Sequence, residues 1–337
     1  MCHFHDAESH AHTNGSSMQR ILLNAHIPEE LTDLRLDQAL ARLFPEYSRA
    51  RLTQWLKSGE VLLDGQVRRP RDRVLGGEAV TIDAGIEDAN PASTAEPIDL
   101  DIVYEDEALL IINKPVNLVV HPGAGNRQGT LLNALLHHCP DLSTVPRAGI
   151  VHRLDKNTTG LMVVAKTIES HHQLIEAMQA REIRREYEAV VHGVMTAGGT
   201  IDEPIGRHPV DRKRMAVVAT GKPSVTHYRV VQRFRLHTWI RVKLETGRTH
   251  QIRVHMAHRR YPIVGDPVYG GRMRMPANAS AELQQTLREF SRQALHAIQL
   301  AVPHPLSGEV MEWTAALPDD MRHLIAMLEQ DRLESEQ

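Results

Sequence analysis

The spacing of apolar residues divides the chain into two patterned regions. Between Leu34 and Asp83, a helical period runs through LRLDQALARLF and SRARLTQWLKSG, and short strand-like segments follow around VLLDG and EAVTID. Ser48 and Gly59 are typical of the start and the stop of the second helix. The first region is therefore predicted to be a small unit of two helices and short strands.

The second region, from about residue 98, alternates strand-like and helix-like segments. The strand-like runs are DLDIVYED, ALLIINKP, GLMVVAKT, REYEAVVHG, SVTHYRVVQRF and HTWIRVKLET, and the helix-like runs are GTLLNALLHH, SHHQLIEAMQAR and TGRTHQIRVHMAH. Many of the strands are typical of antiparallel pairing, and no GxGxxG or GxxxxGK[ST] motif opens a helix. We therefore predict an α+β fold, with a mostly antiparallel mixed sheet flanked by helices and loops.

Residues 84–97, AGIEDANPASTAEP, have the composition of a linker, with two prolines and neither lysine nor arginine. Residues 1–17 are polar and rich in histidine, and we interpret them as a disordered extension rather than a weak zinc-binding segment. The predicted domains are residues 18–83 and 98–328, followed by a tail at 329–337.

Composition narrows the class of protein. The chain has 337 residues, 42% hydrophobic and 24% charged, which is ordinary for a globular protein. Its formal net charge of -3 means that a nucleic-acid partner has to be met by local basic patches. The apolar runs are too short to span a bilayer, so no membrane partner is expected. The two cysteines, Cys2 and Cys139, indicate a reducing, cytoplasmic setting.

Basic side chains gather in several short clusters, which we interpret as surfaces for the phosphate backbone of a nucleic acid rather than as merely solvated faces. The predicted contacts are Arg49, Arg51, Lys57, Arg68 and Arg69 in the first region and Arg184, Arg185, Arg212, Lys213 and Arg214 in the second.

The segment AGIVHRLDKNTTGLMVVAKT, residues 148–167, packs polar residues into a turn directly before a buried strand. Arg153 and Lys156 flank Asp155 closely enough to keep its carboxylate ionised. Such a carboxylate is a candidate nucleophile or general base, whereas an aspartate in a turn also often satisfies backbone amides. The local sequence leaves both interpretations open.

The segment LETGRTHQIRVHMAH, residues 244–258, is equally dense in polar chemistry. It is compatible with a zinc site made of His250, His255 and His258, with a phosphate or carboxylate clamp centred on Arg248, or with a solvated surface. The HExxH arrangement is absent, and arginine is well suited to bidentate contact with an anion. The clamp is the favoured hypothesis, and no metal is predicted.

Three further residues are candidates for the site. Tyr187 lies among arginines in REIRREYE, where it is either a ring on which an extruded base stacks or a core residue of a strand. His121 lies in NKPVNLVVHPGAG, residues 113–125, which is predicted to line a cleft. His121 or His152 is a candidate acid or base, although a structural hydrogen bond is the more frequent role of histidine.

Five motifs, in order, resemble the RluA-type family of RNA pseudouridine synthases. They are INKPVNLVVHPG (112–123), HRLDKNTTGLMVVAKT (152–167), REYEAVVHG (185–193), ETGRTHQIRVHMAH (245–258) and GDPVYGG (265–271). The likeness runs from about Gln19 to Leu328, and the first region resembles the alpha-L RNA-binding domain shared with a ribosomal small-subunit protein. It implies an enzyme that isomerises uridine in RNA without a cofactor.

The resemblance also implies roles for individual residues. Asp155 aligns with the essential aspartate, Tyr187 with the base-stacking tyrosine, and Arg248 with the basic residue that pairs with that aspartate. Arg153 aligns with the arginine that fills the stack when the uridine flips out. A closed apolar pocket is expected around Tyr187 and the strand at 161–164. The remaining expected substrate contacts are His152, Leu154, Lys114, His121, Thr249 and Arg253.

Finer details, RLDQAL (35–40), PRAGIVHRLDK (146–156) and TAGGTIDEPI (196–205), most resemble members that modify large-subunit ribosomal RNA. This implies the helix 69 stem-loop of 23S ribosomal RNA as target, in the large subunit or its precursor, and a monomer in a bacterial cytoplasm. Attack on C1′ and deprotonation of C2′ both stay open as the role of Asp155. A non-catalytic RNA-binding factor and a zinc hydrolase are the rival classes.

Overall fold

The computed structural model describes residues 19–44, 47, 49–86, 94–123, 126–211 and 213–336. The described residues fall into two compact units, and the division between residues 90 and 91 lies inside the predicted linker. The predicted extension at 1–17, the helix cap at Ser48 and the predicted RNA contact Arg212 lie outside the described residues.

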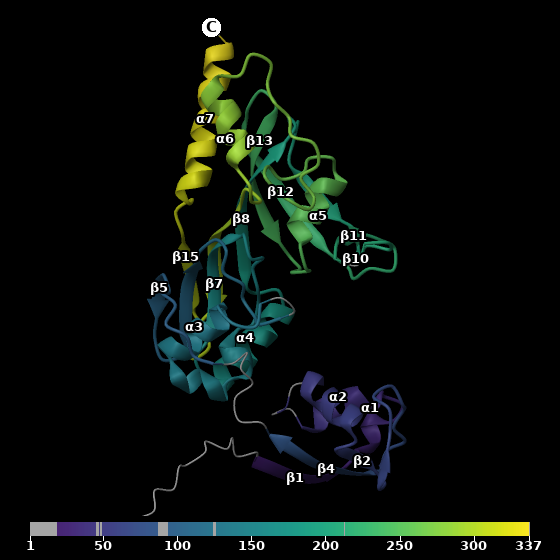
Figure 1. Ribbon diagram of the computed structural model, residues 1–337. Coiled ribbons are helices and arrows are strands. Elements are labelled where there is room, and N and C mark those ends of the chain that lie inside the picture. The colour runs from purple at the N-terminus through teal and green to yellow at the C-terminus, as the bar shows by residue number, and fades with distance from the viewer. Residues whose placement is uncertain are drawn as a thin grey trace, which may run out of the picture. The chain divides into compact units, whose positions relative to one another are not determined.

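The first unit is a four-stranded antiparallel sheet with two helices (Figure 1). Its elements are β1 (Gln19–His26), the short η1 (Glu29–Leu31), α1 (Leu36–Leu43), α2 (Arg49–Ser58), β2 (Val61–Leu63), β3 (Gln66–Val67) and β4 (Ala79–Ile86). The strand order is β1-β4-β2-β3, so β1, which the apolar pattern did not reveal, is one of the two edge strands. Leu40, Leu52 and Ile82 are fully buried in a core that belongs to this unit alone.

The second unit is built on a nine-stranded mixed sheet. Its first half contains β5 (Ile102–Glu105), β6 (Leu109–Lys114), α3 (Leu131–His138), η3 (Pro140–Thr144), η4 (Pro146–Gly149), β7 (Thr159–Ala165), α4 (Ile168–Gln179) and β8 (Arg184–His192). The second half contains β9 (Gly199–Asp202), β10 (Ile205–Arg207), β11 (Met215–Val217), β12 (Val225–Arg233), β13 (His237–Leu244), α5 (Gln251–His258), α6 (Ala281–Glu289), β14 (Leu295–Pro303), β15 (Val310–Thr314) and α7 (Asp319–Ser335).

The strand order is β5-β6-β7-β14-β8-β13-β12-β9, with β15 beside β14, while β10 and β11 form a separate hairpin. Every pairing in the large sheet is antiparallel except that of β7 with β14. The predicted α+β class and mostly antiparallel mixed sheet are therefore confirmed.

Helices cover both faces of the sheet around β6 and β7 (Figure 1). Leu110 and Ile112 share a core cluster with α3, whereas Leu109 and Ile111, the alternate residues, share one with α4. A strand covered on both faces has no polar side, which explains the continuous apolar run of β6.

The C-terminal helix corrects a predicted boundary. α7 continues to Ser335, through residues 329–335 that the sequence analysis assigned to a tail. Asp331 in this stretch is buried and pairs with Arg235 at 2.9 Å, so the helix is part of the second unit.

The parallel pairing of β7 with β14 positions the loop before β7 next to β8. The parallel ladder pairs Thr159 of β7 with His296 of β14 and Gly160 with Ala297, and Ala297 also pairs with Tyr187 on β8. Gly160 has a φ of +114°, and a Cβ there would lie 2.2 Å from the carbonyl oxygen of Ala297, so only glycine fits. The loop before β7 therefore arrives next to the middle of β8.

Two buried histidines make the stability of this unit depend on pH. His192 on β8 and His237 on β13 are register partners with ring centroids 5.1 Å apart. Burial, reinforced by the nearby Arg274, lowers the pKa of His192 to about 4; burial, with His192 and Arg274 nearby, lowers the pKa of His237 to about 3. Below pH 6.5, the ordinary histidine pKa, these two histidines bind protons in the unfolded chain but stay neutral in the folded chain.

We expect the free energy of unfolding to fall as the pH drops from about 7 towards 4, because the folded pKa values are depressed. His237→Leu removes one histidine whose pKa is depressed by folding. The slope of the unfolding free energy against pH should therefore decrease by up to about 1.4 kcal/mol per pH unit. Urea unfolding at a series of pH values measures the slope, with His172→Leu on the exposed face of α4 as control. Identical slopes for wild type and His237→Leu would contradict the assignment.

Candidate active site

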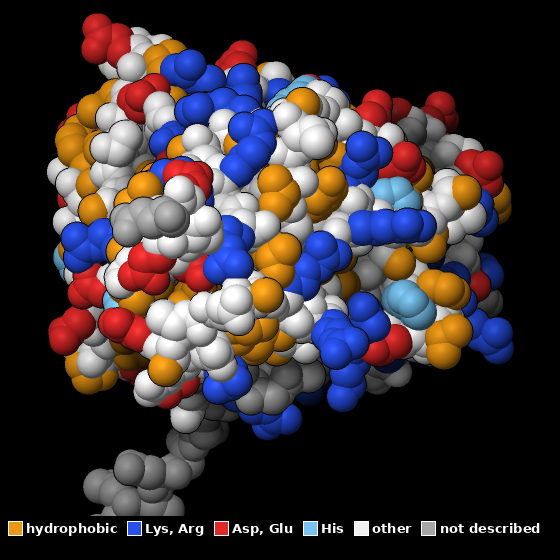
Figure 2. Space-filling model, turned by 90° about the horizontal axis from the view of Figure 1, so that it is seen from above, with side chains coloured by type: hydrophobic (Ala, Val, Ile, Leu, Met, Phe, Trp, Pro, Cys, Tyr) orange, Lys and Arg blue, Asp and Glu red, His pale blue; other side chains and the backbone are white. Residues whose placement is uncertain are grey.

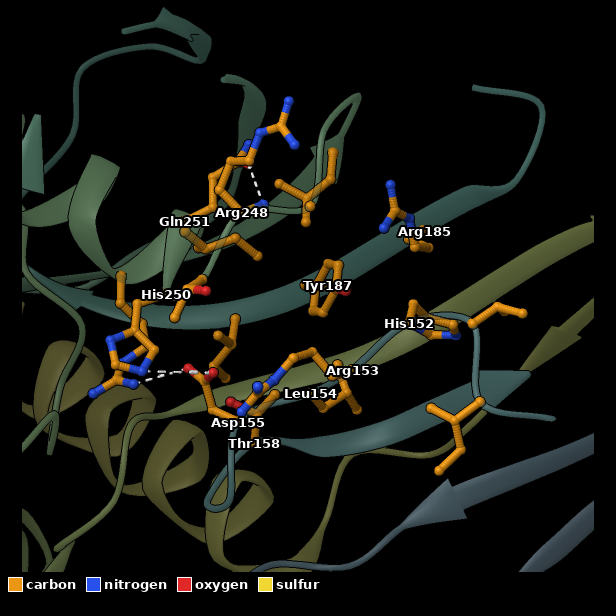
Figure 3. A pocket seen from close by; sticks show the side chains of 18 of the residues that line it. His152, Arg153, Leu154, Asp155, Thr158, Arg185, Tyr187, Arg248, His250 and Gln251 are labelled. Carbon is orange, nitrogen blue, oxygen red and sulfur yellow. Dashed lines mark hydrogen bonds and ion pairs between the residues drawn. The ribbon is translucent and has the colours of Figure 1, made fainter. Parts of the chain in front are cut away.

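A pocket of about 530 Å³ collects the chemistry-bearing residues from segments far apart in the sequence (Figure 3). Its walls come from the loop before β7, from β8 and from the segment that leads into α5. The lining includes His121, Arg147, Ile150, His152, Arg153, Leu154, Asp155, Thr158, Met178, Arg185, Tyr187, Leu244, Gly247, Arg248, Thr249, His250, Gln251, Ile252, Arg253 and Leu295.

Asp155 presents a carboxylate that is held by one hydrogen bond, with a histidine ring near its other oxygen. Arg253 donates from Nη1 to Oδ2 at 2.8 Å, and the Nε2 atom of His250 lies 3.8 Å from Oδ1. The side chain is 18% exposed, so it is accessible from the pocket but fixed in direction. An oriented and partly desolvated carboxylate is suited to act as nucleophile or base.

Arg253 is itself fixed by a second carboxylate. Its Nε and Nη2 atoms donate to the two oxygens of Asp266 at 2.7 and 2.9 Å, and its guanidinium lies 5.1 Å from the ring centroid of Tyr269. Burial opposes the charge of Arg253, but the hydrogen bonds and charges of Asp266 and Asp155 outweigh it and raise the pKa of Arg253. A permanent cation therefore stands against Asp155.

The prediction that Arg248 pairs with Asp155 is wrong, because Arg253 takes that position. Arg248 lines the pocket, but its Nε atom donates to the carbonyl of Pro223 at 3.3 Å instead of to Asp155. The reason lies in the backbone: His250 adopts a left-handed φ of 57° and α5 begins at Gln251. Arg248 thus stays outside the helix and exposed, whereas Arg253 lies in its first turn and is buried.

Tyr187 is 5% exposed and lies in the centre of the pocket (Figure 3). It belongs to the main core cluster and also lines the cavity, so the two interpretations left open by the sequence describe one residue. Burial raises the pKa of its hydroxyl, which keeps the ring neutral.

Both candidate histidines are held neutral by their surroundings. The Nε2 atom of His152 accepts a hydrogen bond from the backbone N–H of Val163 at 3.1 Å, and burial, with Arg185 nearby, lowers the pKa of His152 to about 3. Burial and the charges of Arg147 and Arg153 lower the pKa of His121 to about 4. The structural role is therefore the better description of His152.

Lys114 does not line the pocket, contrary to its predicted contact with substrate. It is 1% exposed, and its Nζ atom donates to the carbonyl oxygens of Pro115, Leu118 and Lys156. Because Lys156 follows Asp155, Lys114 anchors the loop that carries the carboxylate. Burial lowers the pKa of Lys114 to about 7.

Of the remaining predicted contacts, Leu154 is buried in the wall, and Arg153 and Thr249 are exposed at the pocket. Arg185 is misassigned as a contact of the RNA backbone, because it is 7% exposed and lines the cavity. The expectation of an apolar pocket around residues 161–164 is also wrong: those residues do not line it, and its walls contain Arg147, Arg153, Arg185, Arg248 and Arg253.

The histidines considered for zinc do not converge. His255 is buried between the hydroxyl of Thr226 and the carbonyl of Glu203, away from the carboxylate that His250 approaches. Among the residues that the structure describes, no group of three or more metal-binding side chains lies together. In the same residues, no helix is long and apolar enough to cross a bilayer.

Sequence reasoning missed Asp266 and Tyr269. Both lie in GDPVYGG, which was noted only as a motif of the resemblance. The hydroxyl of Tyr269 forms a hydrogen bond with Nδ1 of His250 at 2.9 Å. The same hydroxyl oxygen accepts a hydrogen bond from the backbone N–H of Met215. An aspartate between glycine and proline is typical of a turn, so no local signal marked its pairing with an arginine thirteen residues earlier.

The comparisons with known proteins agree with this geometry. The model of the RNA pseudouridylate synthase family matches residues 108–258, and that of the S4 domain matches residues 34–80. The ribosomal large subunit pseudouridine synthase D of Pseudomonas aeruginosa is 60% identical over 308 residues, which cover 91% of this chain and 96% of that protein. Its namesake in Escherichia coli is 59% identical over 93% of this chain and 96% of that protein.

Among solved structures, Human RNA Pseudouridylate Synthase Domain Containing 4 superposes with a TM-score of 0.53 at 28% identity. The match covers 68% of this chain and 92% of that one. With a fold, a pocket and near full-length relatives in agreement, the chain belongs to the RNA pseudouridylate synthase family and is an RNA pseudouridine synthase with an S4 domain at its N-terminal side.

Proposed function

We propose that this enzyme converts uridine to pseudouridine in large-subunit ribosomal RNA, with the helix 69 stem-loop of 23S ribosomal RNA as its target. The substrate is inferred from relatives at about 60% identity whose names specify the ribosomal large subunit. The observation that carries the chemistry is the carboxylate of Asp155, oriented by Arg253 beside the ring of Tyr187 in one pocket.

The reaction begins with a base that leaves its stack. A uridine inside a stem-loop has to be extruded at a cost of a few kcal/mol, and the exposed Arg153 at the pocket is placed to occupy the vacated position. The extruded uracil then stacks on Tyr187, which brings its C1′ atom towards Asp155.

Asp155 then has two possible roles. It attacks C1′ to form an ester, or it removes the proton of C2′ to give a glycal; in both routes the C1′–N1 bond breaks and C5 later joins C1′. The bond moves within one nucleotide, so the reaction consumes no water and no redox equivalent. We propose that the enzyme works without a cofactor, as a cytoplasmic monomer on the large subunit or its precursor.

The S4 domain supplies affinity through phosphate contacts. Lys57, Arg68 and Arg69 are exposed, whereas Arg49 donates to the buried Asp37 and contributes to the fold. Lysine and arginine side chains form several groups on the face drawn in Figure 2, with hydrophobic side chains between them. Such a mixed surface suits backbone contacts together with unstacked bases.

Replacing Arg68 and Arg69 by glutamine should weaken RNA binding. The slope of log affinity against log salt concentration should become shallower by about one for each phosphate contact that is lost. The rate at saturating RNA should not change, because neither residue belongs to the pocket. Filter binding at several salt concentrations measures the affinity and its salt dependence, and single-turnover tritium release measures the rate. Arg20→Gln with Arg42→Gln removes two other exposed arginines from the same domain and serves as the control; an equal loss in the control would refute specific contact.

Tritium release from RNA that carries [5-³H]uridine tests the proposed reaction, because C5 loses its hydrogen when it becomes the glycosidic atom. The substrate is a transcript of the helix 69 stem-loop, with assembled large subunits in parallel and a chelator-treated sample alongside. Release that persists with chelator supports the proposal. Tight binding without release from either substrate would instead favour a non-catalytic RNA-binding factor.

A further inference from the structure

Arg185 is a buried cation in the pocket, and the proposed reaction described above assigns no role to it. Its side chain lies on β8 two residues before Tyr187, and alternate residues of a strand share one face. Both therefore face the cavity, with their Cα atoms about 6.6 Å apart. Figure 3 shows Tyr187 between Asp155 and Arg185.

Among the residues that the structure describes, no carboxylate pairs with Arg185. Among the described residues, its Nε atom is buried without a hydrogen-bond partner, and Asp155, on the other side of Tyr187, is the one acidic residue in the lining. Glu186 and Glu188, its neighbours on β8, point to the opposite face, where they pair with Arg241. A buried charge without a partner is costly, so its retention points to an anion that enters the pocket during function.

The anion is formed in the reaction itself. When the C1′–N1 bond breaks, its electron pair stays on uracil, whose negative charge spreads over N1, O2 and O4, while C1′ is taken up as the Asp155 ester or as the glycal. Attack of C5 on C1′ then uses this negative charge. It displaces the Asp155 carboxylate from the ester, or it adds to the glycal while the protonated Asp155 returns its proton to C2′. The C5 proton then leaves to a base, and N1 takes up a proton. Both routes pass through the same uracil monoanion.

We propose that Arg185 stabilises the detached uracil anion by donating hydrogen bonds to its carbonyl oxygens. The guanidinium stands beyond Tyr187 as seen from Asp155, which is where the far edge of a stacked uracil lies when its C1′ faces Asp155 (Figure 3). A phosphate of the RNA backbone is the weaker candidate, because Arg185 is 7% exposed and lies next to the ring on which the extruded base is proposed to stack.

Gly247 supports this placement. A Cβ at residue 247 would lie 2.8 Å from Nη1 of Arg185, so the glycine leaves room for the guanidinium. Gly247→Ala should displace the tip of this flexible side chain while keeping its charge, and it provides a second, independent way to perturb the contact.

The inference rests on the proposed function, and single-turnover tritium release separates the two. We compare wild type, Arg185→Gln, Arg185→Lys and Gly247→Ala on the helix 69 transcript and measure RNA affinity alongside. Arg288→Gln, an exposed arginine on α6, is the control for charge. Inactive wild type would refute the proposed reaction, whereas active wild type leaves the role of Arg185 to be decided by the variants.

We expect Arg185→Gln to lower the single-turnover rate at saturating RNA by about 100-fold or more, as the loss of a donor to developing charge does, with affinity changed less than about threefold. Arg185→Lys should recover part of the rate, and Gly247→Ala should lower the rate without changing affinity. The opposite pattern, an unchanged rate with weaker binding and a smaller salt slope, would identify a phosphate contact and overturn the proposal.

A better leaving group distinguishes stabilisation of the anion from general damage to the pocket. Fluorine at C5 withdraws electrons and stabilises the uracil anion, so 5-fluorouridine RNA should depend less on Arg185. We expect the Arg185→Gln defect, followed as loss of the starting nucleoside, to be several-fold smaller with 5-fluorouridine than with uridine. Equal defects on both substrates would contradict the proposed role.

Discussion

Asp155→Asn is expected to abolish pseudouridine formation while leaving the fold and RNA affinity intact. The amide is nearly isosteric, so it still meets the pocket, but it neither attacks C1′ nor accepts the C2′ proton. Loss of the reacting group of an enzyme costs about 10⁴-fold or more in rate. Single-turnover tritium release from the helix 69 transcript measures this loss.

The control for this variant uses the neighbouring aspartate. Asp266→Asn removes a carboxylate from the same network, but Asp266 contacts Arg253 and does not line the pocket. It should keep measurable turnover, because Asp155 retains its bond to Arg253. Turnover by Asp155→Asn at more than a hundredth of the wild-type rate would rule out its essential role.

Arg253→Gln is expected to lower both stability and rate. The variant leaves Asp266, whose side chain is fully buried, without its cation, and removing one partner of a buried ion pair costs about 3–5 kcal/mol. Asp155 also loses the donor that orients it, which should reduce the rate by about 10²- to 10⁴-fold. Thermal unfolding and single-turnover release measure the two effects.

A double variant separates the two roles of Arg253. Arg253→Gln with Asp266→Asn removes the uncompensated charge, so most of the stability should return while the rate stays low. Arg253→Lys keeps a charge but cannot bridge two carboxylates in one plane, and we expect an intermediate rate. Recovery of the rate in the double variant would show that Arg253 acts on stability alone.

The sequence by itself determined the class of fold and most of the chemistry. Apolar periodicity located the longer helices and strands between residues 34 and 258, because each of them shows its buried face locally. It did not reveal β1 or the short strands β3, β9, β10 and β11. The resemblance in separate motifs pointed to Asp155 and Tyr187, and the structure brings both into one pocket.

Only the tertiary structure decided which arginine meets which anion. Arg248 and Arg253 lie five residues apart in one dense motif, and the left-handed turn at His250 places the second against Asp155 and the first at the rim. On β8, Arg184 is exposed whereas the next residue, Arg185, is buried, because successive residues of a strand point to opposite faces. A local pattern records residue types, whereas the partner of a charged side chain depends on distant segments, such as Asp266, that meet it only in the folded chain.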